Sequence, residues 1–334
     1  MSLYRLEALR SIRKILSLCE LRPGDTLAIY TDTGKSPALV EGFFGAALAL
    51  DLEPLMLTIP APHKMLQEPS PPALLAMKGA KMVADLSSEQ WLYTNGLNEI
   101  LDSGVGVLQV LSTEHTLVKM TPTEALVQRA QRVAKMLTKA KEIRITSDNG
   151  TDVVANVAGR NGWGQDGIVN KPGEWDSTPS SIFACAPIEG SVEGTLVVEP
   201  GDFVWTTPKE ILVSDQMTIK LKKGRAAEIQ GRADAKMTED WLASFGDPNS
   251  YIVAHTGFGG DPRASIDQAQ EVESIEGCIN FALGANIFRG LGGKNKAKSH
   301  LDIMLMKQSM FLDDECVVKD GKIVHPDLAI GPIR

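Results

Sequence analysis

The strongest constraint on the fold is an alternation of apolar strands and helices in the first half of the chain. Runs with strand character at 26–30 and 55–59 flank a helical pattern at about 37–50. Two further strand-like runs follow at 81–85 and 106–111. Strands that alternate with helices form a parallel sheet, because each parallel connection must cross the sheet and usually does so as a helix. The first half therefore predicts an α/β domain with a parallel, Rossmann-like sheet.

From about residue 140 the pattern changes to alternating strands and tight turns. Segments 193–202 and 217–225 alternate apolar and polar residues, and the segment 310–324 predicts a terminal hairpin that turns at Asp320-Gly321. The Pro-, Gly- and Ser-rich segment 172–181 predicts a loop. We therefore expect two domains: an α/β domain at 1–140 and a mixed α+β, metal-binding catalytic domain at 141–334. Both have ordinary domain sizes.

Composition excludes several classes of partner. The net charge of −8 and the pI near 5.3 argue against a nucleic acid or an anionic membrane, since either would require a basic patch. The amino terminus is too charged for a signal peptide, and no apolar run approaches the ~20 residues of a membrane span. The four cysteines lie far apart and predict reduced thiols in a cytoplasmic protein.

Three side chains form a possible 2-His-1-carboxylate metal set: His255, His300 and Asp302. In His300-Leu-Asp302 the two ligands are separated by one residue at the start of an apolar strand, so both point to the same face. His255 arrives from a separate element, and Gly-Phe-Gly-Gly after it predicts a turn. Such a set with open positions suits a non-haem Fe(II) oxygenase. The same spacing is equally consistent with a structural role without a metal, in which a histidine beneath a strand is hydrogen-bonded to a nearby aspartate.

Several motifs, taken together, resemble the 2,5-dihydroxypyridine 5,6-dioxygenase family. They are Gly173-Glu-Trp-Asp176, Glu193-Gly-Thr-Leu-Val197, His255-Thr-Gly-Phe-Gly259, Pro262-Arg-Ala264, Gly292-Gly-Lys294 and His300-Leu-Asp-Ile303. The resemblance covers the second half continuously and the first half more faintly. It implies a homo-oligomeric, iron-dependent enzyme that opens a hydroxylated pyridine ring with O₂ in bacterial nicotinic acid breakdown. It also implies an aminopeptidase-like fold, because this family is related to the thermophilic-type leucyl aminopeptidases.

The two branches of that superfamily have different metal sites, and the residues of this chain at the ligand positions distinguish between them. The peptidases hold two zinc ions, and at three of their ligand positions this chain has Ile182, His255 and Asn280. Of the peptidase ligand positions, only those of His300 and Asp302 keep a ligating residue in this chain. The resemblance therefore implies one Fe(II) held by His255, His300 and Asp302 in place of a dinuclear zinc site.

The chain also departs from the dioxygenase pattern. Ala282 stands where the family has a serine at the iron site, Gln165 and Ser177 replace acidic or imidazole pocket residues, and Tyr93 lies near the position of a further histidine. We expect Tyr93 and Asn280 to hydrogen-bond the substrate. Gln165, Ser177 and Ala282 are candidates to line its pocket, and so is Trp175, which either stacks on a flat ring or is an ordinary core residue.

Three functions stay open from the sequence. The first is a mononuclear Fe(II) extradiol-type dioxygenase that takes a small N-heterocyclic aromatic substrate and O₂. The second is a zinc-dependent hydrolase or aminopeptidase-like enzyme. The third is a binding protein that kept the fold without turnover. The substrate ring and the bond that is cleaved do not follow from the sequence.

Overall fold

The computed structural model describes residues 3–206 and 209–333, and these divide into two compact units. Unit 1 extends to Val127 and also contains Gln165–Ser180, whereas unit 2 contains Gln128–Gly164 and continues from Ser181. The boundary expected at 140 differs from this division in two places. Residues 128–140 pack with the second unit, and 165–180 return to the first.

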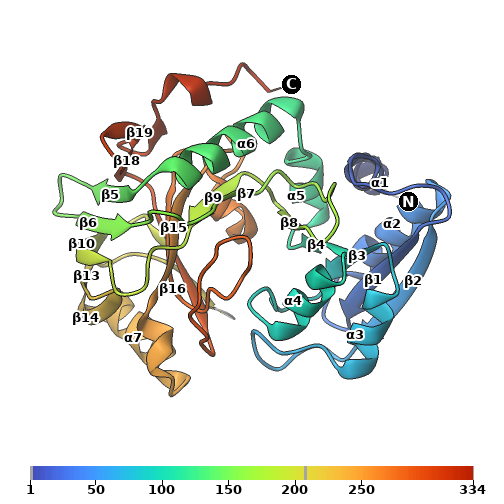
Figure 1. The fold of residues 1–334 in the computed structure, drawn as a ribbon, viewed down its shortest axis with the longest axis horizontal. Helices are drawn as coiled ribbons and strands as arrows, with labels where there is room; N and C mark the ends of the chain where they lie inside the picture. Colours follow the sequence, from blue (N-terminus) through green and yellow to red (C-terminus); the bar gives the residue numbers. More distant parts are fainter. Residues whose placement is uncertain (1–2, 207–208, 334) are drawn as a thin grey trace. The chain divides into compact units, whose positions relative to one another are not determined.

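Unit 1 is built on a five-stranded parallel sheet, as the strand and helix alternation predicts. The strand order is β2-β1-β3-β4-β8. The strands are β1 (Thr26–Asp32), β2 (Glu53–Ile59), β3 (Met82–Leu86), β4 (Gly106–Val110) and β8 (Trp175–Thr178), and every pair is parallel. The helices are α1 (Leu3–Leu18), α2 (Pro37–Leu48), α3 (Pro71–Lys78), α4 (Asn95–Asp102) and α5 (Glu114–Lys119) (Figure 1).

The burial pattern explains why this sheet forms. Strands β3 and β4 are buried at every position, which is typical of parallel strands covered by helices on both faces. Phe43 of α2 packs in one core cluster with Leu27 and Ile29 of β1. Helix α2 begins at Pro37, where a missing backbone N–H costs no helical hydrogen bond.

Strand β8 lies in the segment that the sequence predicted as a loop. Its residues Trp-Asp-Ser-Thr lack the apolar periodicity of a strand, yet Trp175 pairs with Val107 of β4 and extends the sheet. The segment is a strand because a distant strand offers it hydrogen bonds, and no local pattern encodes that pairing.

Unit 2 contains two antiparallel sheets, which confirms the mixed architecture of the second half. Their strand orders are β14-β13-β10-β6-β5-β18-β19-β20 and β12-β11-β17-β16-β15-β9-β7. The strands of the first sheet are β5 (Glu142–Thr146), β6 (Asp152–Asn156), β10 (Glu193–Val198), β13 (Met217–Lys222), β14 (Arg225–Gly231), β18 (Ser309–Leu312), β19 (Glu315–Lys319) and β20 (Lys322–Ile323). Those of the second are β7 (Gly162–Gly164), β9 (Ile182–Cys185), β11 (Phe203–Thr206), β12 (Lys209–Leu212), β15 (Val253–Gly259), β16 (Ile279–Gly284) and β17 (His300–Leu305).

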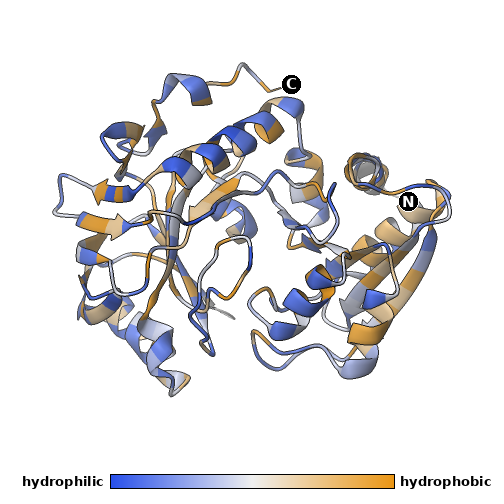
Figure 2. Cartoon of the chain, in the orientation of Figure 1, coloured by the Kyte–Doolittle hydropathy of each residue, from blue (hydrophilic) through white to orange (hydrophobic). Residues whose placement is uncertain are grey.

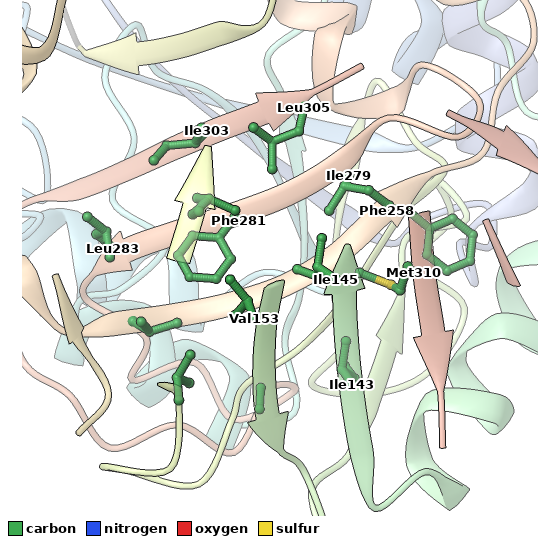
Figure 3. Packing of buried hydrophobic residues seen from close by; sticks show 14 of the residues in the cluster. Ile143, Ile145, Val153, Phe258, Ile279, Phe281, Leu283, Ile303, Leu305 and Met310 are labelled. Atoms are coloured by element: carbon green, nitrogen blue, oxygen red, sulfur yellow. The ribbon is translucent and has the colours of Figure 1, made fainter. Parts of the chain in front are cut away.

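The two sheets share one hydrophobic core. Figure 3 shows Ile145 and Val153 of the first sheet beside Phe281 and Ile303 of the second, and all are buried in one cluster. Helix α7 (Ala233–Ser244) and the part of helix α6 (Glu124–Lys139) that follows Val127 also belong to this unit. Figure 2 shows hydrophilic and hydrophobic residues alternating along α6, whose residues Val133 and Leu137 are buried in the same cluster.

The terminal segment predicted as one hairpin over 310–324 contains three strands. Strands β18, β19 and β20 form two successive antiparallel pairs, so the chain turns at Asp313-Asp314 as well as at Asp320-Gly321. Asp313 and Asp320 both have positive φ, which aspartate tolerates in turns.

None of the helices in the described part of the chain combines the length and apolar composition needed to cross a bilayer.

Candidate metal centre

The three candidate ligands lie on two central strands of the second sheet of unit 2. His255 is on β15, whereas His300 and Asp302 are on β17, with β16 between them. Ala282 of β16 pairs with His255 on one side and with Asp302 on the other. Directly paired residues point to the same face of a sheet, so the row His255–Ala282–Asp302 shares one face, and His300 joins it two residues before Asp302.

The opposite face of these strands is apolar and holds the row in place. Residues Ile279, Phe281 and Leu283 of β16 alternate with the site positions and are buried in the shared core (Figure 3). On β17, Leu301, Ile303 and Leu305 likewise alternate with the site positions and are buried in the shared core. Because side chains alternate with a period of two, burying these apolar residues fixes the direction of the polar ones.

A bulge in β15 aims His255 at the site. Val253 pairs with Leu283 and His255 with Ala282, so β15 has one extra residue at this point. Val253 and Phe258 both face the core although they are five residues apart, an odd spacing that a regular strand would not allow. The bulge reverses the alternation between them, and such bulges are frequent beside functional sites.

The Gly-Phe-Gly-Gly segment after His255 is largely strand, where the sequence predicted a turn. Strand β15 runs through Gly259 and pairs with β9 on its other side. A Cβ atom on Gly257 would lie 1.7 Å from the carbonyl oxygen of Phe183 in β9. The glycine is therefore needed for close approach of two strands, and a turn prediction from glycine content alone was wrong here.

Three ligand atoms converge at this row. His255 Nε2 lies 3.2 Å from His300 Nε2 and 3.5 Å from Asp302 Oδ1, and His300 Nε2 lies 3.2 Å from Asp302 Oδ1. The side chains of the three residues are at most 14% exposed. The structure therefore brings together the three residues that the sequence selected.

One hydrogen bond determines which ring nitrogen of His300 carries the proton. Its Nδ1 lies 2.8 Å from the carbonyl oxygen of Ala285, which can only accept, so Nδ1–H is the donor. In the neutral imidazole Nε2 then carries a lone pair that points toward His255 and Asp302. A carbonyl that orients a ligating histidine in this way is common at metal sites.

Burial and charge prepare the other two groups for ligation. Burial lowers the pKa of His255 to about 4, which keeps its imidazole neutral. Burial acts to raise the pKa of Asp302, but the positive charge that His300 and His255 carry when protonated outweighs it and lowers that pKa below its usual value. Asp302 is therefore a carboxylate.

This donor set fits a divalent cation. Two imidazole nitrogens and a carboxylate oxygen converge within 4.8 Å of one another, and this is the metal-ligand cluster found among the residues that the structure describes. Lone pairs brought this close repel each other unless a proton or cation lies between them. Imidazole and carboxylate suit iron or zinc, and a 2-His-1-carboxylate set is typical of non-haem Fe(II) oxygenases.

A fourth group, Glu273, was missed by sequence reasoning. It lies in the 3₁₀ helix η2 (Ala269–Ser274), and its carboxyl group hydrogen-bonds that of Asp302. Burial and the charge of Asp302 raise the pKa of Glu273 well above its usual value, so Glu273 is the protonated donor of this pair. Nothing in the polar segment around Glu273 distinguishes it from a surface acid, so only the folded structure reveals it.

The candidates on β16 have different surroundings. Asn280 is buried, its Nδ2 donates to the carbonyl oxygen of Glu273 at 2.9 Å, and its Oδ1 lies 3.8 Å from the Sγ of Cys278. Its amide is thus engaged by the segment that carries Glu273. Ala282 is fully buried between His255 and Asp302, where its methyl group leaves the site face uncrowded.

The remaining candidates, Tyr93, Gln165, Trp175 and Ser177, belong to unit 1. Ser177 Oγ donates to Gln165 Oε1 at 3.2 Å, so the structure brings these two residues together. Trp175 is the first residue of β8 and is 4% exposed. Tyr93 is also buried, between β3 and α4.

Comparisons with known proteins agree with the motif pattern. A family model described as 2,5-dihydroxypyridine 5,6-dioxygenase matches residues 7–325. The 2,5-dihydroxypyridine 5,6-dioxygenase of Pseudomonas putida KT2440 is 29% identical over 262 residues, which is 75% of this chain and 73% of that protein.

Two solved structures are similar over almost the whole chain. The 2,5-dihydroxypyridine dioxygenase structure from Pseudomonas putida KT2440 matches with a TM-score of 0.88 and 25% identity, covering 97% of this chain and 99% of that one. Wild-type AmpT from Thermus thermophilus matches with a TM-score of 0.63 and 12% identity, covering 96% and 100%. The second likeness shows the fold alone and is consistent with the expected aminopeptidase-like fold.

Proposed function

The chain belongs to the 2,5-dihydroxypyridine 5,6-dioxygenase family, and from this premise we propose that it is a mononuclear non-haem Fe(II) dioxygenase. Its substrate would be a hydroxylated pyridine whose ring it opens with O₂ in an extradiol-type cleavage. One observation carries the proposal: the lone pairs of His255, His300 and Asp302 converge on one buried face. Two imidazoles and one carboxylate leave other coordination positions open for ring and oxygen.

The division of labour between metal and protein follows from the chemistry. Bound Fe(II) would supply the redox chemistry that allows O₂ to react with an electron-rich ring, which amino acid side chains do not provide. The protein would then orient the reactants and exclude water. The apolar core beneath β15, β16 and β17 holds the three ligands from below and keeps that side dry.

The residues around the ligands set their charge and direction. The Ala285 carbonyl holds the proton of His300 on Nδ1, and burial keeps His255 neutral. Asp302 contributes the one negative charge, which it shares through a hydrogen bond with protonated Glu273. Sharing that charge would lower the donor strength of Asp302 and hold its orientation.

Substrate contacts are assigned on the family resemblance. Tyr93 and the hydrogen-bonded pair Gln165 and Ser177 offer polar groups for ring hydroxyls or the ring nitrogen, and Trp175 offers a flat apolar face. Asn280 donates one Nδ2–H to the Glu273 carbonyl oxygen, and the second N–H of the same amide is the group that would contact the substrate. The cytoplasmic location and the homo-oligomeric assembly belong to the same proposal, and cell fractionation and light scattering on the purified protein test them.

The decisive experiment combines metal analysis with oxygen uptake. We expect one iron per chain in protein purified anaerobically with Fe(II), and O₂ consumption with 2,5-dihydroxypyridine. His300→Ala should abolish both iron binding and O₂ consumption. It should not unfold the protein, because the His300 side chain points to the face of β17 that carries the site and not to the face that packs in the core. His325→Ala is a matched control, because it also replaces a histidine but one outside the ligand set. His325 caps the short η3 helix (Pro326–Leu328).

Two results would contradict the proposal. Two zinc ions per chain with peptidase activity would favour the hydrolase alternative. Full iron binding by His300→Ala would show that the ligands are assigned wrongly.

A further inference from the structure

Unit 1 contains a pocket of its own at the carboxyl ends of its parallel strands. The pocket has a volume of about 300 Å³, and all its lining residues belong to unit 1. The lining includes Tyr30 of β1, Ile59 at the end of β2 and Ser87 directly after β3. We call it the strand-end pocket. Its volume lies at the lower end of the range for small-molecule sites.

The topology of the sheet makes this a favourable place for a ligand. From β1 the chain passes outward to β2, and it then returns across β1 to β3 on the other side. The connections that leave the carboxyl ends of β1 and β3 therefore run in opposite directions. In open parallel sheets, ligands bind in the crevice at the carboxyl ends of strands where the direction of connection reverses in this way.

The walls of the strand-end pocket suit a flat, apolar body. The rings of Tyr30 and Trp91 pack edge to face, with centroids 5.7 Å apart and planes at 74°. Both residues line the pocket, and so do Pro60, Pro62 and Pro69. Aromatic faces carry negative charge density, so they attract organic cations as well as apolar rings.

The charges in the pocket are acidic. Among the described lining residues there is no lysine or arginine, the one histidine is His63, and the carboxylates are Glu68 and Glu89. Glu68 is already used, because its two oxygens accept hydrogen bonds from the backbone N–H groups of Asn95 and Gly96 at the start of α4.

Glu89 is the carboxylate left for a ligand. It is half-buried, and within the described residues its side chain makes no hydrogen bond or ion pair. Burial and the negative charge of Asp32 raise the pKa of Glu89, as expected for a carboxylate without a cationic partner. Lys35, whose Nζ donates to the carbonyl oxygen of Val110 at 2.6 Å, is not among the groups that shift this pKa.

From these observations we propose that the strand-end pocket binds a flat organic monocation, such as a pyridinium or a protonated aromatic amine. The positive charge pairs with Glu89, and the ring lies against Tyr30 and Trp91. The site is distinct in its residues from the His255–His300–Asp302 centre, so the proposal does not depend on the reaction at that centre.

Calorimetric titration of the full-length protein with N-methylpyridinium tests the proposal. We expect saturable binding of one cation per chain, with benzyl alcohol and benzoate binding at least about tenfold more weakly, because they lack the positive charge. Glu89→Gln should weaken cation binding about tenfold while circular dichroism shows an unchanged fold. Glu53→Gln, an exposed carboxylate at the start of β2, is the matched control and should bind as wild type does.

A second pair of variants separates this site from the metal centre. His300→Ala should bind N-methylpyridinium with wild-type affinity. Trp91→Phe should remove the change in tryptophan fluorescence that accompanies binding. The proposal is overturned by absence of saturable binding, by equal affinity for the three probes, by an unaffected Glu89→Gln, or by loss of binding in His300→Ala.

Discussion

At the scale of single residues, the site depends on groups that hold the ligands as much as on the ligands. The pair of Glu273 and Asp302 places two carboxyl groups in direct contact, and such a pair is stable only when one of them keeps its proton. Because burial and the charge of Asp302 raise the pKa of Glu273, the proton resides on Glu273. A hydrogen bond from this carboxyl group then restrains the ligand oxygen.

Substitutions at Glu273 test this role. Glu273→Ala should lower the affinity for Fe(II) or Zn(II) by about 10- to 100-fold, the usual effect of removing a group that orients a metal ligand. Glu273→Gln retains an N–H donor toward Asp302 and should stay close to wild-type affinity. Titration against a competing chelator measures both. A loss of equal size in the two variants would mean that the charge of Glu273, and not its donor, matters.

A buried acid in unit 1 gives a pH prediction. Burial raises the pKa of Asp85 to about 6, although hydrogen bonds from Ser87 act against this. The folded protein therefore binds more protons than the unfolded chain between pH ~4 and ~6. The free energy of unfolding should fall as pH rises through this window, by about 3 kcal/mol for a pKa difference of about 2.

Asp85→Asn isolates this contribution. The variant cannot lose a proton at this position, so its unfolding free energy should lack the fall between pH 4 and 6. Urea denaturation at several pH values measures the difference between wild type and variant. Asp51→Asn, at an exposed turn, is the control and should follow the wild-type profile. An identical slope for Asp85→Asn and wild type would contradict the prediction.

At the scale of secondary-structure elements, the position of His255 depends on how closely β15 approaches β9. Gly257 allows this approach, because a Cβ atom there would lie 1.7 Å from a backbone oxygen that cannot move aside alone. Gly257→Ala should therefore lower the unfolding free energy by about 3 kcal/mol or more and weaken metal binding, since β15 also carries the ligand.

Gly45→Ala provides the opposite control. Gly45 lies within helix α2, and nothing lies within 4 Å of its Cβ position. Alanine should raise the unfolding free energy there by up to ~1 kcal/mol, because it is the better helix former. Thermal denaturation of both variants checks the contrast. If Gly257→Ala is as stable as wild type, β9 and β15 are not as close as described.

The elements that were predictable from sequence are those with a strong local pattern. The alternation in β16 and β17 encodes the face on which His300 and Asp302 lie, and the apolar runs of β1, β3 and β4 encode the parallel sheet. Strand β8 and the bulge at His255 depend on distant partners, so local patterns predicted a loop and a turn instead. Glu273 has no sequence signal, because only the chain fold brings it to Asp302.

At the scale of the whole molecule, the two units are interleaved along the chain. The chain leaves unit 1 at Val127, returns at Gln165 and leaves again after Ser180. The returning segment supplies β8, which pairs with β4 through Val107 and Trp175. Without it, β4, which is buried at every position in the intact chain, would become an edge strand, and exposed apolar edge strands promote aggregation.

A fragment ending at the boundary suggested by the sequence should therefore not fold well. Residues 1–140 lack β8 and should aggregate or unfold without a cooperative transition. Joining residues 1–127 to 165–180 through a flexible linker restores the strand, and this chain should be monomeric with a sigmoidal urea transition. Size-exclusion chromatography and urea denaturation compare the two. Equal cooperativity would mean that β8 is dispensable, and that the first unit is complete within the first 140 residues after all.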